Sequence, residues 1–299
     1  MASSFASKHL ELRESIEQAL DLHTQIGDGC PKRLREAIRY SVLSPGKRLR
    51  PLLALLACKA LGQDWKKALP AACAVEFIHV YSLIHDDLPA MDDDDLRRGK
   101  PTCHKQFDEA TAILAGDSLQ MLAIEVLCNQ LEPETAARCC QMLAKSAGSR
   151  YLVGGQADDL AAEGRFGQNP ELGSAEFLKN IHLRKTGALI VVSLQLGGVI
   201  GGANDEQIAV LGQFGHCIGL AFQIVDDCLD VEASVEQMGK MTRKDDFSGK
   251  LTYPNLLGLT ASKQLAQDLI REAQKAVAVF GNEANELTEL AEFVGQRNS

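Results

Sequence analysis

The chain has 299 residues, of which 45% are hydrophobic and only 5% aromatic, and its formal net charge is −9 at pH 7. That length can enclose a sizeable core. The low aromatic content, with Ala and Leu abundant, favours helices over a β-sandwich. Acidic residues gather in short runs while basic residues are scattered, so a nucleic acid is excluded as the main partner.

The cysteines and the N-terminal residues indicate in which cellular compartment the protein is expected. The nine cysteines are an odd number and form no CxxC pattern, so we expect reduced thiols in a cytoplasmic protein. The first 20 residues lack the continuous apolar segment of a signal peptide. No apolar run approaches the ~18 residues needed to cross a bilayer, and we expect no membrane span.

Helical periodicity recurs along nearly the whole chain. It predicts helices at 10–26, 33–43, 51–61, 69–87, 108–130, 133–148, 175–202, 205–230 and 261–280. Breakers at 44–46, 164–173 and 234–249 separate some of them, and no convincing alternating strand is present. None of the breakers is a long linker, so the sequence predicts one all-α domain of packed helices spanning residues 1–299.

An acidic stretch, DDLPAMDDDD at 86–95, follows an apolar helix. A helix C-terminus is unfavourable for carboxylates because the dipole end there is already negative, so a cation would relieve repulsion between Asp86 and Asp87. Mg²⁺ suits this place because it takes oxygen ligands and completes its shell with phosphate oxygens. In a straight helix Asp92 would lie about 120° from Asp86. Pro89 should break the helix and let Asp92 fold back towards Asp86.

A second acidic motif, DDCLD, occupies 226–230 near the end of another apolar helix. Asp226 and Asp230 fall about 40° apart on one helix face, one turn from each other, a spacing that suits a shared cation or its water shell. Either motif alone is as readily a solvated helix end. Two of them, with Arg97 and Arg98 beside the first, favour a cation site for an anionic substrate.

Together the two motifs, about 140 residues apart, resemble those of the trans-isoprenyl diphosphate synthase family, and specifically of bacterial farnesyl diphosphate synthases. The resemblance runs from about residue 34 to 259. It implies a helical bundle of the isoprenoid synthase type with a central active-site cavity. The implied reaction is a Mg²⁺-dependent head-to-tail condensation of isopentenyl diphosphate with dimethylallyl and geranyl diphosphate, giving farnesyl diphosphate. A homodimer is also implied. The apolar helix at 108–130 is a candidate for its interface and equally a candidate for the core.

The resemblance also implies a metal site built from six aspartates. Asp86, Asp92 and Asp226 would ligate the metal, and Asp87, Asp227 and Asp230 would support them directly or through water. Three Mg²⁺ ions per active site are implied, with Mn²⁺ as a substitute, bridging the allylic diphosphate between the two motifs.

Basic residues are implied to bind the two diphosphates. GKRLRP at 46–51 resembles the family's homoallylic motif. The residues implied to hold isopentenyl diphosphate are Gly46, Lys47, Arg50, His79 and Arg98. The residues implied to bind the allylic diphosphate are Arg97, Lys185 in a KTG element, Lys240 in a GK pair and Lys250 in GKLTYP. Without the resemblance, each lysine is as readily a surface residue, and His79 as readily a core residue.

The catalytic residues implied are Lys185, Thr186 and Gln223. The Thr186 hydroxyl and the Gln223 carbonyl could stabilise an allylic cation without attacking it. No protein base is evident, and family analogy gives the proton to the departing pyrophosphate. Ser82 and Tyr81, respectively four and five residues before the first aspartate, would set the floor of the tail pocket. A large residue at the place of Tyr81 implies that growth stops at C15.

Two places depart from the family pattern. In GGQADDLA at 154–161, Asp158 replaces an apolar residue and Ala161 replaces an acid, and MTRKD at 241–245 differs from the usual TAGKD. These departures bear on loop closure and kinetics rather than on the reaction.

Four other interpretations remain open at this point. A geranylgeranyl diphosphate synthase uses the same residues, and Tyr81 argues against it. A terpene cyclase needs no second diphosphate site, so Lys47, Arg50 and His79 count against it. A non-catalytic partner subunit of the same fold would not need intact acidic motifs. A generic acidic cation-binding module would bind Mg²⁺ or Ca²⁺ without a diphosphate.

Overall fold

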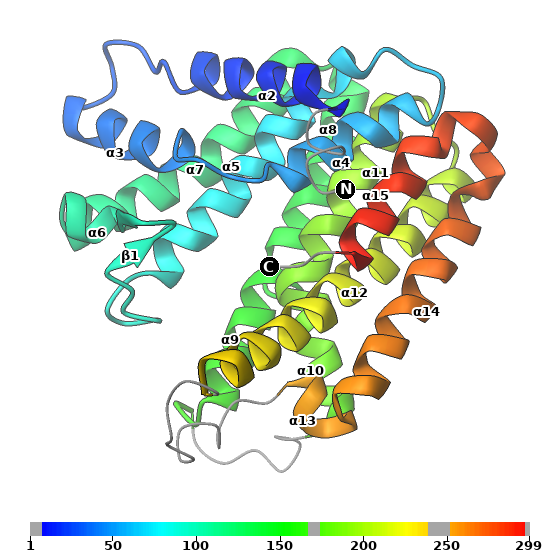
Figure 1. Ribbon diagram of the computed structural model, residues 1–299. Helices are drawn as coiled ribbons and strands as arrows, with labels where there is room; N and C mark the ends of the chain where they lie inside the picture. Colours follow the sequence, from blue (N-terminus) through cyan, green and yellow to red (C-terminus); the bar gives the residue numbers. More distant parts are fainter. Residues whose placement is uncertain (1–7, 167–173, 239–251, 297–299) are drawn as a thin grey trace. The chain divides into compact units, whose positions relative to one another are not determined.

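The computed structural model describes residues 8–166, 174–238 and 252–296, most of which are helical (Figure 1). The chain divides into two compact units. The first comprises 9–144 with 192–204, and the second comprises 1–8, 145–191 and 205–299. The predicted all-α class is confirmed, and the prediction of a single domain stays a prediction.

The first unit is built around two helices that are buried on all sides. Its elements are α2 (Leu10–His23), α3 (Lys32–Val42), α4 (Leu49–Lys59), the 3₁₀ turn η1 (Trp65–Ala68), α5 (Leu69–Asp86), α6 (Cys103–Gln106), α7 (Glu109–Gln130) and most of α8 (Pro133–Ala147). Residues 51–58 of α4 and 71–78 of α5 are all buried. A helix that is apolar all round belongs in a core, and α5 packs against both α4 and α7.

A short hairpin follows α5. Strands β1 (Leu96–Arg97) and β2 (Lys100–Pro101) are antiparallel, with Leu96 opposite Pro101. The two loop residues have φ of 54° at Arg98 and 76° at Gly99, as two-residue hairpin turns require. The sequence shows no convincing alternating strand, and this hairpin leaves no such pattern because two residues per strand are too few to show alternation.

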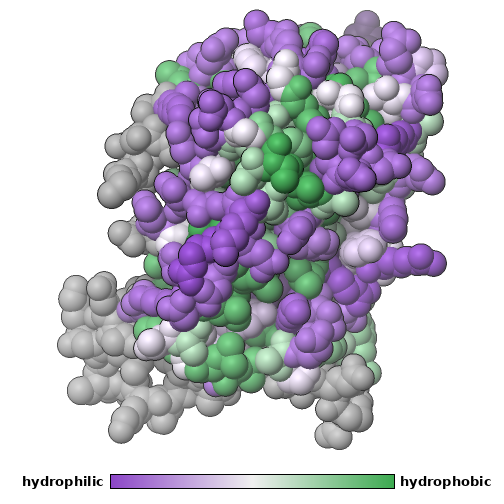
Figure 2. Space-filling model, turned by 90° about the vertical axis from the view of Figure 1, so that its right-hand side faces the viewer, coloured by the Kyte–Doolittle hydropathy of each residue, from purple (hydrophilic) through white to green (hydrophobic). Residues whose placement is uncertain are grey.

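The second unit contains α9 (Leu152–Ala162), α10 (Ala175–His182), the π-helical turn η2 (Leu183–Gly187), α12 (Asp205–Met238), α13 (Tyr253–Leu257), α14 (Leu259–Val277), the 3₁₀ segment η3 (Ala278–Ala284) and α15 (Asn285–Gly295). Helix α11 (Ala188–Ile200) contains the boundary between the two units. One face of α14 enters the core, because its buried residues recur every three or four positions: Ser262, Ala266, Ile270, Ala273 and Val277. Hydrophilic side chains predominate on the surface seen in Figure 2, with apolar side chains showing between them.

The nine predicted helices all exist, within a few residues at most ends, and the structure adds others. The predicted breaker at 234–249 begins too early, since α12 continues to Met238. Helix α9 escaped prediction because Gly154 and Gly155 disfavour a helix yet lie within one. Helices α13 and α15 were also missed, and the predicted helix at 175–202 is interrupted by η2.

Four helical segments are long and apolar enough to cross a membrane by length and composition alone. They cover 65–86, 109–130, 175–200 and 205–232, and between 50% and 67% of each apolar window is buried within the protein. Core burial therefore accounts for much of this apolar character. The expectation that none of them spans a membrane stays a prediction.

Candidate active site

The first acidic motif lies where α5 ends. Helix α5 stops at Asp86, and the chain turns back at once, so that the Asp92 amide donates to the Asp86 carbonyl over 2.8 Å. The Asp93 amide donates to the Leu88 carbonyl over 3.1 Å, and Asp93 has a positive φ of 53°. The expected return of the chain is thus confirmed, and Asp86 and Asp92 are held on one tight loop.

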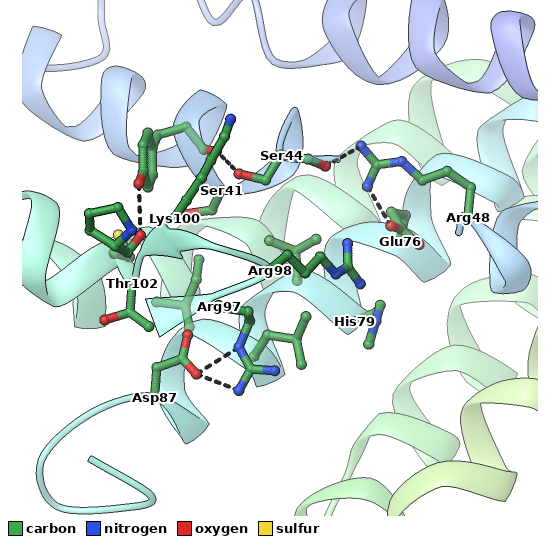
Figure 3. A pocket seen from close by; sticks show the side chains of 16 residues that line it. Ser41, Ser44, Arg48, Glu76, His79, Asp87, Arg97, Arg98, Lys100 and Thr102 are labelled. Carbon is green, nitrogen blue, oxygen red and sulfur yellow. Dashed lines mark hydrogen bonds and ion pairs between the residues drawn. The ribbon is translucent and has the colours of Figure 1, made fainter. Parts of the chain in front are cut away.

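Asp87 has different surroundings from its neighbour. It is 3% exposed, and its Oδ1 accepts hydrogen bonds from Arg97 Nε at 2.7 Å and Nη2 at 2.5 Å (Figure 3). Burial raises the pKa of the Asp87 carboxyl, and the Arg97 guanidinium opposes that rise. The sequence placed Arg97 on the allylic diphosphate, whereas the structure shows it bridging the hairpin to Asp87.

Three of the predicted anion-binding residues come together beside the pocket shown in Figure 3. Arg50 Nη1 lies 3.4 Å from His79 Nε2, and both His79 and Arg98 line the pocket. Arg98 Nη1 donates to the Pro45 carbonyl over 2.6 Å. A Cβ at Gly46 would lie only 2.4 Å from Arg98 Nη1, so a larger residue there would displace the Arg98 guanidinium.

The charges of this group are unbalanced. Burial lowers the pKa of Arg50 to about 10. The pKa of His79 lies well below 6.5 because burial, followed by repulsion from Arg50 and Arg98, disfavours the imidazolium. Within the described residues neither Arg50 nor Arg98 has a carboxylate within 4.0 Å, and the buried Arg50 Nε has no hydrogen-bond partner. Two cations close together, one of them partly withdrawn from water without a counterion, are unfavourable, so this group is suited to an incoming anion.

Arg48, two residues before Arg50, is by contrast fully paired. It has a left-handed φ of 49°, is 3% exposed, and bonds Glu17 and Glu76 at 2.7 Å each. Sequence reasoning missed this buried ion pair network. The signal was Glu76, an acid alone within the apolar run of α5. Lys47 of the same motif is exposed.

The second acidic motif lies on α12, within the other unit. Asp226 and Asp227 are half-buried and Asp230 is exposed. Asp227 Oδ2 accepts a hydrogen bond from the Tyr253 amide at 3.0 Å and lies 3.8 Å from His182 Nε2. Asp227 therefore anchors the start of α13.

The KTG element forms the π-helical turn η2, a rare form that is frequent at functional sites. Thr186 Oγ1 donates to Gln223 Oε1 over 3.2 Å, so the two residues predicted to stabilise a cation are in contact. Lys185 Nζ lies 2.6 Å from Asp159 Oδ2. Asp159, the acid that is retained in GGQADDLA at 154–161, therefore holds the predicted catalytic Lys185 in place.

The Asp158 side chain, which departs from the family pattern, also has a partner. Arg184, next to Lys185, forms an ion pair with Asp158 and donates from Nε to the Arg150 carbonyl over 3.0 Å. Two parallel ion pairs therefore join α9 to η2. Ala161 is half-buried near the end of α9, and no described contact explains it.

The two residues predicted to set chain length lie on α5. Tyr81 is 5% exposed, and its ring meets that of His85 edge-on, with centroids 5.7 Å apart. Ser82 Oγ donates to the His79 carbonyl over 2.9 Å. Neither residue lines the pocket in Figure 3. Two predicted residues, Lys240 and Lys250, lie outside the described residues.

The ligand chemistry of the two motifs fits a hard divalent cation. Aspartates offer carboxylate oxygens alone, which suit Mg²⁺ or Mn²⁺ rather than a soft metal. A third acidic group, Asp93, Asp95 and His104, has ligand atoms within 4.8 Å of one another. Lys105 already pairs with Asp95 at 2.8 Å. Sequence reasoning did not single out this group.

Comparison with known proteins identifies the family. The family model described as polyprenyl synthetase matches residues 31–287. The chain belongs to the polyprenyl synthetase family. The resemblance inferred from the motifs is therefore confirmed.

Members similar to this polyprenyl synthetase carry names of more than one product. Geranylgeranyl pyrophosphate synthase 11, chloroplastic, of Arabidopsis thaliana is 45% identical over 303 residues, which cover 100% of this chain and 84% of that protein. The heterodimeric geranylgeranyl pyrophosphate synthase large subunit 2 of the same plant is 45% identical over 287 residues, 95% of this chain and 75% of that protein. A solved FPP/GFPP synthase from Zymomonas mobilis has a TM-score of 0.86 and 38% identity, covering 99% of this chain and 100% of that one.

The polyprenyl synthetases are divalent-metal-dependent prenyltransferases that act on isopentenyl and allylic diphosphates. This chain is accordingly a prenyltransferase of isoprenoid biosynthesis.

Proposed function

We propose that this polyprenyl synthetase condenses isopentenyl diphosphate with allylic diphosphates, in a reaction that depends on Mg²⁺. The observation that carries the proposal is the group formed by half-buried Arg50, half-buried neutral His79 and exposed Arg98, which has no carboxylate partner within 4.0 Å among the described residues. His79 lies on the same helix as Asp86, seven residues earlier, so the helix that presents the anion site also presents the metal motif.

In this proposal Gly46, Lys47, Arg50, His79 and Arg98 hold the diphosphate of isopentenyl diphosphate. Arg50 and Arg98 supply charge-assisted hydrogen bonds. Gly46 leaves space for the Arg98 guanidinium, and His79 donates from its ring without adding charge. The exposed Lys47 reaches the diphosphate from the solvent side.

The metal ligands in this proposal are Asp86, Asp92 and Asp226, with Asp230 supporting through water. Asp87 and Asp227 support these ligands without binding the metal directly, because their carboxylates already have partners. Asp87 accepts hydrogen bonds from Arg97, and Asp227 accepts one from the Tyr253 amide. Such supporting contacts orient ligands and are costly to remove. Three Mg²⁺ ions per active site, with Mn²⁺ as a substitute, stay a proposal.

Bound Mg²⁺ would draw charge from the allylic diphosphate and make it a better leaving group. Lys185 adds positive charge near that group, with Arg97, Lys240 and Lys250 proposed to assist it. Asp159 keeps Lys185 in place before the substrate arrives. The carbonyl oxygen of Gln223 and the hydroxyl of Thr186 face the developing allylic cation and stabilise it electrostatically. No described residue is assigned as base, and the released pyrophosphate takes the proton.

We propose geranylgeranyl diphosphate, a C20 product, on the support of the plant relatives that align with the whole chain. Farnesyl diphosphate is the second candidate, and Tyr81 favours it. Its ring is buried five residues before Asp86, where a bulky side chain would limit the length of the tail. The name of the Zymomonas mobilis relative also includes the C15 product.

The test is incubation of the purified protein with isopentenyl and dimethylallyl diphosphates, with and without Mg²⁺, and separation of the products by chain length. A Mg²⁺-dependent C20 product supports the first candidate, and a C15 product supports the second. In the second case Tyr81→Ala should lengthen the product while Tyr81→Phe should not. Absence of any condensation would favour a terpene cyclase or a non-catalytic partner subunit.

We further propose a homodimer in the cytoplasm. Ile113, Leu114 and Met121 of α7 are 44%, 56% and 66% exposed, and such apolar side chains on one helix suit a subunit interface. One relative is named as a heterodimer subunit, so sedimentation of the purified chain alone would separate self-association from a need for another subunit.

A further inference from the structure

Two thiols lie close together where α7 is followed by α8. Cys128 is exposed in the last turn of α7, and Cys140 is half-buried in α8. Their Sγ atoms are 3.8 Å apart, within thiol hydrogen-bonding distance, and both cysteines are free.

The helix arrangement brings these two thiols together. Helix α7 ends at Gln130 and α8 begins at Pro133, so a connection of two residues turns the chain back. Such short connections make neighbouring helices antiparallel. Cys139 is buried with 0% exposure, because adjacent helical residues point about 100° apart. The pair is therefore Cys128 with Cys140 and not with Cys139.

Bond formation needs the two sulfurs to approach each other. A disulfide has an S–S length of about 2.05 Å, and the two Sγ atoms start 3.8 Å apart. A half-exposed pair of this kind differs from a buried structural thiol because a small reagent can reach one sulfur directly.

We propose that Cys128 and Cys140 form a site for thiol–disulfide exchange, which a small-molecule disulfide such as oxidised glutathione converts to an internal disulfide. The Cys128 thiolate attacks one sulfur of the reagent, forming a mixed disulfide and releasing one glutathione thiolate. The Cys140 thiolate then attacks the Cys128 sulfur and releases the second glutathione. Two protein thiols lose two electrons and two protons, and one glutathione disulfide becomes two glutathione molecules.

The order of the two attacks follows from the surroundings of the thiols. Burial, followed by the hydrogen bond with Cys128, raises the pKa of Cys140 to about 11, so Cys140 is poorly ionised at neutral pH. Cys128 is exposed and reacts first. Cys140 is then adjacent to the mixed disulfide and resolves it, and the product fastens α8 to the C-terminal turn of α7.

The test uses the full-length protein in buffers of increasing ratio of oxidised to reduced glutathione, followed by alkylation and trypsin digestion without reduction. Cleavage after Lys105, Arg138 and Lys145 puts Cys128 in the peptide 106–138 and Cys140 in the peptide 139–145. We expect these two peptides to be recovered joined. Thiol titration should show a loss of two of the nine thiols, and dithiothreitol should restore both.

Three variants assign the bond. Cys128→Ser and Cys140→Ser should each abolish the joined peptides, and Cys128 in the second variant should carry a lasting glutathione adduct. Cys30→Ser, which removes another accessible thiol, should leave the joined peptides unchanged. The proposal is overturned if the wild type gives no joined peptides at any ratio, or if Cys140→Ser still gives them through Cys139.

Discussion

At the scale of single residues, Arg48 and Arg50 stand two positions apart in one basic motif and have opposite surroundings. Arg48 has two carboxylate partners, while Arg50 has none within the described residues. Residue spacing alone does not distinguish the two arginines, because it does not show which of them pairs with Glu76 in the core. We assign Arg48 to stability and Arg50 to substrate binding.

Substitution separates these two roles. Arg50→Gln should raise the KM for isopentenyl diphosphate about 10- to 100-fold, because each charge-assisted hydrogen bond contributes roughly 1.5–3 kcal/mol, while Tm stays the same or rises. Arg48→Gln should instead lower the free energy of unfolding by about 3–5 kcal/mol, because it leaves Glu76 buried and unpaired. Steady-state kinetics and thermal unfolding of both variants measure this. Equal losses of stability would show that the assignment is wrong.

His79 predicts a pH dependence of stability. Its pKa in the folded protein lies well below 6.5, so below about pH 6.5 the unfolded chain binds a proton that the folded protein does not. Its contribution to stability is present above pH 6.5 and is lost as pH falls towards the folded pKa, by at most about 1.4 kcal/mol per pH unit. Urea unfolding from pH 7.5 to 5.5 should show a shallower decline for His79→Gln than for the wild type. Parallel curves would contradict this.

At the scale of elements, α7 fixes the end of α5 through a close approach. His85 Nε2 lies 3.1 Å from the Ile113 carbonyl, and a Cβ at Gly116 would come within 2.1 Å of the same nitrogen. Because His85 directly precedes Asp86, this contact sets where the first acidic motif begins.

Gly116→Ala should therefore displace His85 and the motif after it. We expect Mg²⁺-dependent activity to fall at least about tenfold, with a loss of roughly 1–3 kcal/mol in stability from overpacking. Gly29→Ala is the matched control, since no atom lies within 4 Å of the Cβ that it adds. Activity titrated against Mg²⁺ measures the effect, and a Gly116→Ala variant with unchanged Mg²⁺ dependence would exclude this role for α7.

The ion pair between Asp158 and Arg184 should couple α9 to η2. Both side chains are 31% exposed, so we expect a coupling free energy of only about 0.5–1 kcal/mol. A double-mutant cycle of Asp158→Asn and Arg184→Gln, followed by urea unfolding, measures it. The more exposed pair Asp268 and Arg271 on α14 is the control and should give a value near zero. A zero value for both pairs would mean that the departure at Asp158 is structurally neutral.

The same elements show what the sequence could and could not predict. Apolar periodicity located α5, α7 and α12 because their buried faces recur with the helical period. The hairpin at 96–101 and the π turn η2 were not predicted, because each depends on one or two residues and leaves no periodic pattern. The motifs identified Asp86, Asp92 and Asp226, but the partners of Asp87 and Asp227 come from distant segments.

At the scale of the whole molecule, one of the boundaries between the two compact units, at residues 191 and 192, falls inside the continuous helix α11. Unfolding either unit alone would have to break this helix. We therefore expect one cooperative thermal transition, with calorimetric and van't Hoff enthalpies in agreement. Two resolved transitions in a calorimetric scan would contradict the predicted single domain.

The π-helical turn at Leu183–Gly187 has a consequence for how this segment tolerates changes in length. A π turn accommodates one more residue than an α turn between the same two helical ends. Removing a single residue there would restore regular α-helical winding within the turn and leave the helical ends on either side in their original register. Lys185 and Thr186 lie inside this turn, and their bonds to Asp159 and Gln223 depend on the extra residue. Substitutions that keep the length of the turn can therefore be absorbed locally, whereas a one-residue deletion would move the reactive groups without disturbing the rest of the core.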